Sequence, residues 1–361
     1  MATQSKGKRL AITGLGMISS IGPDVVTSCA SLRAGINRPA ETRMEVIDEQ
    51  ALEEVPIIGH PVADLTEGYE GIARYVRLGN RALRDLMAYA ELHDQTASFW
   101  RKTTIVVCLS KARNDDLEVL DDLLTNELPT KLLATAGVPL LASQCTVLPA
   151  GHASVLLACQ LALTHLIPDT YERCIVLGID SLLDSSAIEF FGEANRLKSA
   201  DSPIGLMPGE AAAALLLEDP SAAEKRSART EAYIGAISTK TELRNFLSAE
   251  PVYGRTLAET VVATASEMQR ANDVYVDING EERRAADWAH ALLIVRSRLG
   301  YAPENIIVPA LSLGDTGAAS GAIALCAAVR SFSRGHARSN EVLICSSSET
   351  GEVAAGCVYR A

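Results

Sequence analysis

The two halves of this chain repeat one pattern of strands and helices. In the first half, ERCIVLGIDS at residues 172–181 is followed by GEAAAALLLED at 209–219. In the second half, NEVLICSSSE at 340–349 is followed by GEVAAGCVYRA at 351–361. Each pair contains a strand pattern, a turn, a Gly-Glu step, small residues and a second strand pattern. Such a repeat sets the architecture of a chain, although an Ala-rich α/β sequence can also repeat these patterns by chance.

A Gly-containing turn and an Ala-rich helix pattern precede each pair. They read LPAGHASVLLACQLA from residue 148 and GDTGAASGAIALCAA from residue 314. We therefore expect two similar halves as domains, residues 1–222 and 230–361. The polar segment 219–229, DPSAAEKRSAR, is expected to be an exposed linker between them.

Apolar strand patterns alternate with helix patterns along the chain, which predicts a layered α/β fold. The expected strands are residues 9–13, 104–108, 174–178, 212–217, 274–277, 305–308, 342–345 and 356–359. The expected helices are residues 72–92, 115–124, 152–166, 256–271, 284–299 and 318–332. The helix at 152–166 is apolar nearly all round, so we expect it to be buried on every side.

Composition excludes several classes of partner. The 361 residues are 48% hydrophobic and 22% charged, a balance typical of a globular chain with a large core. The net charge of -12 argues against nucleic acid or an anionic membrane as the main partner, because both require concentrated Lys and Arg. No apolar run reaches the ~18–20 residues that span a bilayer, so no membrane span is expected.

The eight cysteines occur singly, without a CxxC pair and without His at metal-binding spacing. They are typical of reduced core cysteines in a cytoplasmic protein, so we expect neither a disulfide framework nor a metal site. The polar start, residues 1–8, does not resemble a secretory signal, which also favours the cytoplasm. Because GxGxxG and Walker patterns are missing, we expect no nucleotide cofactor.

Three blocks of the sequence resemble the β-ketoacyl synthases of the thiolase superfamily. RLAITGLGMISSIGPDVVTSCASLRAG at 9–35 is similar to the opening strand, Gly-rich turn and first helix of that family. GHASVLLACQLAL is similar to the helix after the nucleophile, and GDTGAASGAIAL to the family's GHTxGAAGAIEA. The resemblance implies a thiolase-like five-layer αβαβα fold with two pseudo-repeated halves, and a homodimer.

The catalytic Cys and two His of that family are replaced at the matched positions. TVLPAG places Leu148 at the nucleophile, DINGEE places Asn279 at the first His, and GDTGAASG places Asp315 at the second. Leu has no lone pair with which to attack a thioester. Asn can donate to an oxyanion but is not a base, and a carboxylate is a poor substitute for imidazole. The resemblance therefore implies that no catalytic residue is intact.

The surroundings of these positions are changed as well. The family's Lys maps to Ala310, and its GFGG gate maps to SETGE at 348–352, where Thr350 and Gly351 are candidate oxyanion or pocket residues. His152 is a further pocket candidate, for which we expect a structural or capping role. Pro149 is expected in the first turn of the helix after Leu148.

Two further interpretations concern neighbouring groups. Residues 281–284 (EERR) are expected to form a solvated helix start. Cys145, three residues before the matched nucleophile, is the alternative candidate for a displaced nucleophile; the expectation is that it lies in a strand and points elsewhere.

These observations favour a non-catalytic protein that acts by binding an acyl chain, a catalytic synthase subunit or an effector protein. By analogy with degenerate relatives, the last would be an adaptor role in type VI secretion. The alternative is an acyltransferase or condensing enzyme of fatty-acid or polyketide metabolism with a non-standard mechanism. In the resembled family the strand before the nucleophile pairs across a two-fold axis, which here implies a homodimer through residues 142–147.

Overall fold

The structure is a computed structural model that describes residues 7–48, 53–111, 123–199, 203–246, 248, 250–251 and 253–361. Ten strands form one hydrogen-bonded series that consists of two sheets of five. In the first sheet the order is β1-β7-β6-β4-β5. Its strands are β1 (Arg9–Ser19), β4 (Thr103–Leu109), β5 (Cys145–Pro149), β6 (Arg173–Ser181) and β7 (Glu210–Glu218).

The second sheet repeats this order as β8-β12-β11-β9-β10. Its strands are β8 (Ala232–Thr241), β9 (Asp273–Tyr275), β10 (Asn305–Ile307), β11 (Glu341–Ser347) and β12 (Glu352–Arg360). In each sheet the three strands at the outer end are parallel, and the remaining pairs are antiparallel. A short antiparallel pairing of β1 with β8 joins the two sheets. The repeat seen in the sequence is therefore a repeat of topology, while the division into domains at 222 and 230 stays a prediction.

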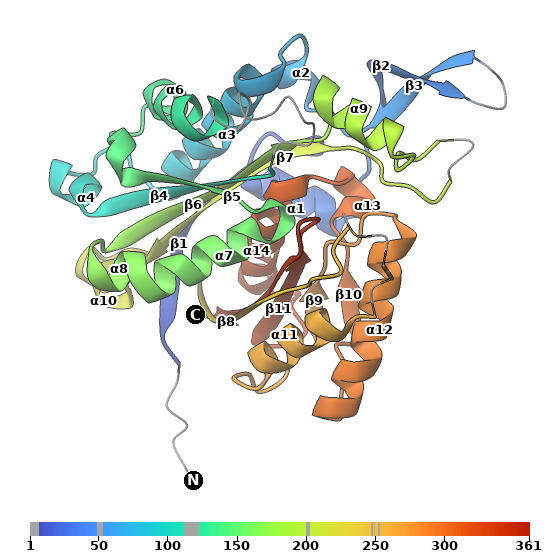
Figure 1. Cartoon of the computed structure of the whole chain (residues 1–361). Helices are drawn as coiled ribbons and strands as arrows, with labels where there is room; N and C mark the ends of the chain where they lie inside the picture. Colours follow the sequence, from blue (N-terminus) through green and yellow to red (C-terminus); the bar gives the residue numbers. More distant parts are fainter. Residues whose placement is uncertain are drawn as a thin grey trace.

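Three helical layers enclose and separate the two sheets (Figure 1). The outer helices α3 (Gly71–Tyr89) and α6 (Leu128–Ala136) pack on one face of the first sheet. The outer helices α11 (Arg255–Ala265) and α12 (Glu282–Leu299) pack on the far face of the second sheet. Between the sheets lie α7 (Ser154–Leu161) and α14 (Ser320–Ser333).

The side chains of each strand alternate between two of these layers. On β4, Val106 and Cys108 face the central helices, while Ile105 and Val107 face the outer ones. Each sheet is therefore buried on both faces, as continuous apolar strands require. This arrangement confirms the predicted five-layer αβαβα fold.

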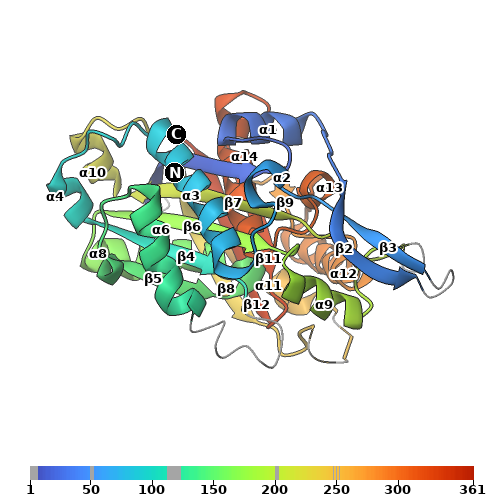
Figure 2. The ribbon, with the colours of Figure 1, turned by 90° about the horizontal axis from the view of Figure 1, so that it is seen from above.

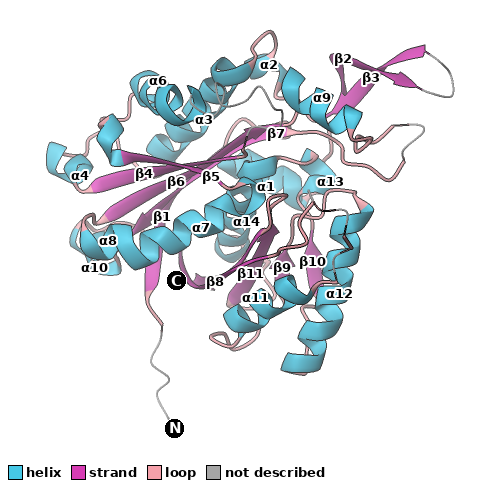
Figure 3. Ribbon diagram, viewed as in Figure 1, coloured by secondary structure: helices cyan, strands magenta, loops and turns pink. Residues whose placement is uncertain are grey.

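Smaller elements lie at the periphery (Figures 2 and 3). The short helices are α1 (Val25–Arg33), α2 (Ala63–Thr66), α4 (Ala97–Arg101), α8 (Ile167–Asp169), α9 (Ser185–Glu193), α10 (Pro220–Lys225) and α13 (Ala310–Leu313). The hairpin of β2 (Ala40–Asp48) and β3 (Glu53–Gly59) projects from the body (Figure 3). Short 3-10 segments are Ala142–Gln144, Gly151–Ala153 and Gly317–Ala319, and π-helical turns are Leu123–Glu127 and Ala162–Leu166. None of the helices in the described ranges combines the length and apolar character needed to cross a membrane.

Several local predictions need correction. The segment 219–229 is not simply an exposed linker, because it contains α10, in which Ala222 and Ala223 are buried. The helix expected at 152–166 is buried only in its first part, and Thr164 and His165 are exposed. The strand expected at 142–147 begins at Cys145, after a 3-10 turn. The helix predicted at 115–124 falls almost entirely outside the described residues.

Candidate functional site

The residues at the matched positions come from four separate segments. They lie in β5 and just after it, after β9, before α14, and in the turn between β11 and β12. The strands β4, β5 and β6 are parallel, as are β9, β10 and β11, so their carboxyl ends lie at common sheet edges. Ligand sites of α/β sheets form at such edges. The fold brings the four segments into contact there through hydrogen bonds of Asp315 and Ser348.

Asp315 is the centre of this contact. Its carboxylate accepts hydrogen bonds from His152 Nε2 at 2.8 Å, from Asn279 Nδ2 at 2.6 Å and from the backbone amide of Gly317 at 2.8 Å. The residue is 3% exposed. Burial alone would raise the pKa of Asp315. The contact with His152 opposes this, as do the guanidinium of Arg284 and the amide of Asn279, and together they hold the pKa well below its ordinary value.

The tautomer of His152 follows from its two partners. Arg284 Nη2 lies 3.3 Å from His152 Nδ1, and a guanidinium can only donate, so Nδ1 accepts. The ring proton is then on Nε2, from which Asp315 receives it. Both ring nitrogens of this buried histidine therefore form hydrogen bonds within the protein, which fits the expected structural role. The expected capping role is not seen, because the turn that contains His152 has no side-chain cap.

Both the nitrogen and the oxygen of the Asn279 side-chain amide form hydrogen bonds within the protein. Its Nδ2 donates to Asp315 and, at 2.8 Å, to Glu281 Oε2. Its Oδ1 accepts the backbone amide of Glu281 at 3.1 Å. An oxyanion donor has to point toward the place where charge develops on a substrate. In this arrangement Asn279 is turned instead toward two carboxylates.

Residues 281–284 begin α12, as the sequence suggested, but this helix start is not solvated throughout. Glu281 is 8% exposed and Arg284 is 5% exposed. Glu281 accepts two hydrogen bonds from Arg196, at 2.6 and 3.0 Å, and Arg196 also contacts Glu349 at 2.6 Å. The prediction failed because the pairing partner Arg196 is 85 residues away in the sequence.

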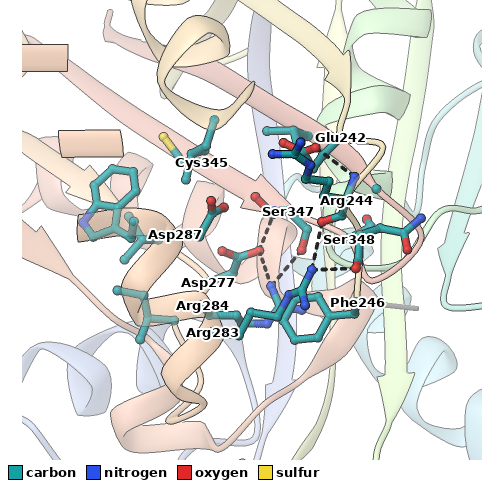
Figure 4. A pocket seen from close by; sticks show the side chains of 17 residues that line it. Glu242, Arg244, Phe246, Asp277, Arg283, Arg284, Asp287, Cys345, Ser347 and Ser348 are labelled. Atoms are coloured by element: carbon teal, nitrogen blue, oxygen red, sulfur yellow. Dashed lines mark hydrogen bonds and ion pairs between the residues drawn. The ribbon is translucent and has the colours of Figure 1, made fainter. Parts of the chain in front are cut away.

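Arg284 connects this cluster to the strand β11. Its Nη1 donates to the carbonyl of Ser347 at 2.7 Å and to Asp277 at 3.2 Å, as Figure 4 shows. Asp277 also accepts the backbone amide of Ser347 at 2.6 Å. The buried guanidinium is thus paired with the carboxylate of Asp277 and the backbone carbonyl of Ser347, and a buried ion needs such partners. Arg196 was not singled out from the sequence, and Arg284 was expected only as part of a solvated helix start.

Leu148 lies apart from this network. It is part of β5, opposite Cys108 of β4, and its partly buried side chain packs against the central core. Pro149 is the last residue of β5, so the prediction that it begins a helix is wrong: the parallel pairing with Leu109 extends the strand by one residue. The helix begins only after the 3-10 turn Gly151–Ala153.

The turn at residues 348–352, which the resemblance matched to the family's gate, is also held by hydrogen bonds within the chain. The hydroxyl of Ser348 accepts the backbone amide of Ala153 at 2.9 Å and donates to the carbonyl of Ala150. Gly351 has φ +104°, and its carbonyl accepts the amide of Glu242 at 2.7 Å. The hydroxyl of Thr350 contacts Glu352 in the same turn. The candidates Thr350 and Gly351 therefore lie in a turn whose polar groups have partners within the chain.

The space around these residues is small. His152, Asn279, Ala310 and Asp315 line one cavity of about 20 Å³. A neighbouring cavity of about 40 Å³, drawn in Figure 4, is lined by Arg284 and Gly351 among others. Volumes of this size hold roughly one to a few waters. Leu148 lines neither of them.

No other nucleophile or metal site stands out in the described part of the chain. Cys145 lies in β5, as expected, and burial raises the pKa of its thiol to about 12. At neutral pH it is a thiol and not the nucleophilic thiolate. Among the described residues, no three or more His, Cys, Asp or Glu gather in a group that could hold a metal ion.

No protein-family model matches the sequence, and no curated protein matches it either. Solved structures do match along the chain. A type II polyketide ketosynthase, in a complex titled AntDE:AntF with its acyl-carrier protein, has a TM-score of 0.78 at 15% identity and covers 98% of this chain and 100% of that one. The ishigamide ketosynthase/chain length factor has a TM-score of 0.74 at 18% identity, again with 98% and 100% covered.

A β-ketoacyl synthase from Burkholderia phymatum gives a TM-score of 0.71 at 17% identity, with 98% of this chain and 100% of that chain covered. At these identities the similarity shows the fold. The chain has the thiolase-like fold of the ketosynthases, as the resemblance in the sequence implied.

Proposed function

We propose that this chain is a non-catalytic protein with a ketosynthase-like fold, and that it acts by binding. The observation that carries the proposal is the closed network around Asp315. The two residues at the matched histidine positions, Asn279 and Asp315, are hydrogen-bonded to each other, and Leu148 replaces the nucleophile. A reaction centre needs groups that face a substrate, and these face one another.

None of these residues can serve as the nucleophile or the base in acyl transfer. Leu148 cannot form a thioester, so covalent catalysis at this position is excluded. Asp315 accepts three hydrogen bonds and its pKa is held well below the ordinary value, so it is a very weak base. The alternative, direct transfer between two bound substrates, needs room for both, and the small cavities beside these residues, of about 20 and 40 Å³, favour the binding role instead.

The binding role we propose is that of a partner subunit or adaptor. One solved structure of similar fold is titled a ketosynthase/chain length factor. The candidate partners are a catalytic synthase subunit, an acyl chain, or an effector protein in a secretion-adaptor role. We further propose a homodimer in the cytoplasm; the reduced state of all eight cysteines is consistent with that compartment.

The test is the intact mass of the protein after incubation with acyl-CoA and acyl-carrier-protein thioesters, with thioester turnover followed in the same tubes. We expect an unmodified mass and no turnover above buffer. A ketosynthase with an intact Cys is the positive control. A stable adduct, or turnover that depends on the protein, contradicts the proposal.

The Leu148→Cys variant separates a missing nucleophile from a closed site. If acyl groups reach position 148, the introduced thiol is acylated; we expect no acylation above the level of an exposed control, Leu293→Cys, whose side chain position is 69% exposed on α12. Faster acylation at position 148 than at position 293 would show an open acyl tunnel. That result would favour acyl-chain binding over a purely structural partner role.

A further inference from the structure

A third and larger cavity is lined by residues that lie far in the sequence from the Asp315 network. It is a groove of about 530 Å³ between α1 and the end of α14, two helices that lie side by side (Figure 2). Val26, Cys29 and Ala30 of α1 form its apolar wall. The volume is in the range of sites that hold a small molecule, and none of the residues discussed above takes part in it.

The polar lining of this groove is basic. Arg33 comes from the last turn of α1, Arg330 from the last turn of α14, and Arg334 and His336 from the residues that follow α14. In the described structure none of the three arginines forms an ion pair with a carboxylate. The one side-chain hydrogen bond recorded for them joins Arg330 Nη1 to Tyr89 Oη at 3.2 Å. Such a concentration of cations is notable in a chain of net charge -12.

Helix dipoles account for only part of this charge. The carboxyl ends of α1 and α14 both point at the groove, and each carries roughly half a negative charge. Three guanidinium groups therefore leave a surplus of about two positive charges. The acidic residues near Cys29 are Asp24 and Asp85. Both carboxylates accept hydrogen bonds from backbone amides near the opposite end of α1. Asp24 accepts the amide of Thr27, and Asp85 accepts the amides of Met17 and Val25.

His336 supplies an independent sign of a missing partner. Its Nδ1 is buried and has no hydrogen-bond partner among the described residues. Burial, and then the charge of Arg33, hold the pKa of His336 below its ordinary value, with Asp273 acting in the opposite direction. A buried polar atom without a partner is costly unless a ligand or water completes it.

We propose that the groove between α1 and α14 binds a phosphorylated small molecule. Its phosphate would be held by Arg33, Arg330 and Arg334, and its remaining part would lie along Val26 and Ala30. Arg recognises phosphate oxygens through paired N–H donors. A phosphate ester carries about -1.5 to -2 charge at pH 7, which matches the surplus of about two positive charges.

The experiment is calorimetric titration of the purified chain with inorganic phosphate, pyrophosphate and ADP at low ionic strength, with chloride at the same ionic strength as the blank. We expect saturable binding of pyrophosphate and ADP, and a rise in unfolding temperature that chloride does not produce. Affinity should fall as salt is added, because the arginines are at least partly exposed.

The double variant Arg33→Ala/Arg334→Ala tests the site. Both side chains are exposed, so the fold should be retained, as the unfolding temperature without ligand will show. We expect at least a tenfold loss of affinity. The matched control is Arg296→Ala/Arg298→Ala, which removes two exposed arginines from the last turn of α12 and so makes the same change in net charge. It should bind as the wild type does.

Three outcomes would overturn the proposal. The first is the absence of binding by all three phosphate compounds. The second is equal affinity in the groove variant and the wild type. The third is binding to vesicles of phosphatidylserine without binding to any soluble phosphate, which would assign the groove to a membrane surface.

Discussion

At the residue scale, the Asp315 carboxylate is held by charge and by hydrogen bonds at the same time. His152, Asn279 and the Gly317 amide occupy its oxygens. Because these donors are themselves fixed by Arg284 and Glu281, the loss of one member leaves others buried without a partner. The residues of this network therefore contribute to stability.

Asp315→Asn should lower the free energy of unfolding at pH 7 by about 3–5 kcal/mol, the usual effect of removing one partner from a buried charged pair. Urea unfolding measures it. The control is Glu67→Gln, which breaks the exposed ion pair with Arg43 and should change stability by less than about 1 kcal/mol. An Asp315→Asn variant as stable as this control would show that the network adds little.

The wild type and the Asp315→Asn variant should also differ in how their stability depends on pH. The pKa of Asp315 is lower in the folded chain than the value of about 3.9 in an unfolded one. Its contribution is therefore complete above about pH 4 and is lost as the pH falls toward the folded pKa. The stability difference between wild type and Asp315→Asn should be constant near neutral pH and shrink below about pH 4.

The cysteines give a second prediction at this scale. Burial raises the pKa of Cys29 and Cys145 to about 12, and raises that of the other six still further. Iodoacetamide at neutral pH should therefore label no thiol of the folded chain, and all eight after unfolding in denaturant. Rapid labelling of Cys145 in the folded protein would contradict this and restore it as a candidate nucleophile.

At the scale of elements, the turn between β11 and β12 has a fixed geometry. Gly351 has φ +104°, and a Cβ at this position would lie 2.3 Å from the carbonyl oxygen of Glu242. A side chain is thus opposed by both backbone conformation and space. Because this turn also places Ser348 against the start of α7, its geometry matters for the whole site.

Gly351→Ala should destabilise the chain more than Gly300→Ala does. Gly300 ends α12 at φ +74°, and no atom lies within 4 Å of a Cβ built there, so Ala costs only the left-handed conformation, about 1–2 kcal/mol. At Gly351 the close contact should add about 1–3 kcal/mol. Urea midpoints compare the two variants, and equal losses would mean that the turn moves freely to admit a methyl group.

Sequence patterns predicted the elements whose signal is local. The strands β4, β6 and β7 and the helices α3 and α12 were expected because each carries its own apolar period. The predicted beginning of β5 was wrong, since the sequence of the Ala142–Gln144 turn has no distinctive pattern of its own. The β2–β3 hairpin, with its mixed polar and apolar residues, was not predicted.

The sequence predicted which residues lie in the site but not which partners they contact. Spacing relative to the resembled motifs selected Asn279 and Asp315, and the structure places them in contact. It did not select Arg196, because an ion pair across 85 residues leaves no periodic trace in the sequence. The role of residues 281–284 was misjudged for this reason: without its partner in view, a buried carboxylate is indistinguishable from a solvated one.

At the scale of the whole molecule, the two halves share one central core. The helices α7 and α14 come from different halves and pack in the same cluster between the sheets. Each half would expose a face of its central helix if the other were removed. The repeat in the sequence therefore describes two copies of one topology that stabilise each other.

The described sheet series has two unpaired edges, β10 and β5, and β5 is the longer of these two strands. β5 is the last strand of its series and pairs only with β4 in the described chain, so its outer edge is available to another strand. Exposed edges are commonly paired or protected, and β5 carries no Lys or Arg. This supports the proposed homodimer through β5, in place of the 142–147 segment expected from the sequence.

Thr146→Lys should convert a β5-paired dimer into a monomer. Thr146 is exposed on β5, and a Lys on an edge strand opposes pairing with a second, identical edge because two like charges would meet. The control is Thr241→Lys, an exposed position on β8, which lies inside the sheet series and pairs with β12. Light scattering at micromolar concentration should give twice the chain mass for the wild type and the control, and the chain mass for Thr146→Lys. A monomeric wild type would refute the dimer, and a Thr146→Lys protein that stays dimeric would place the interface away from β5.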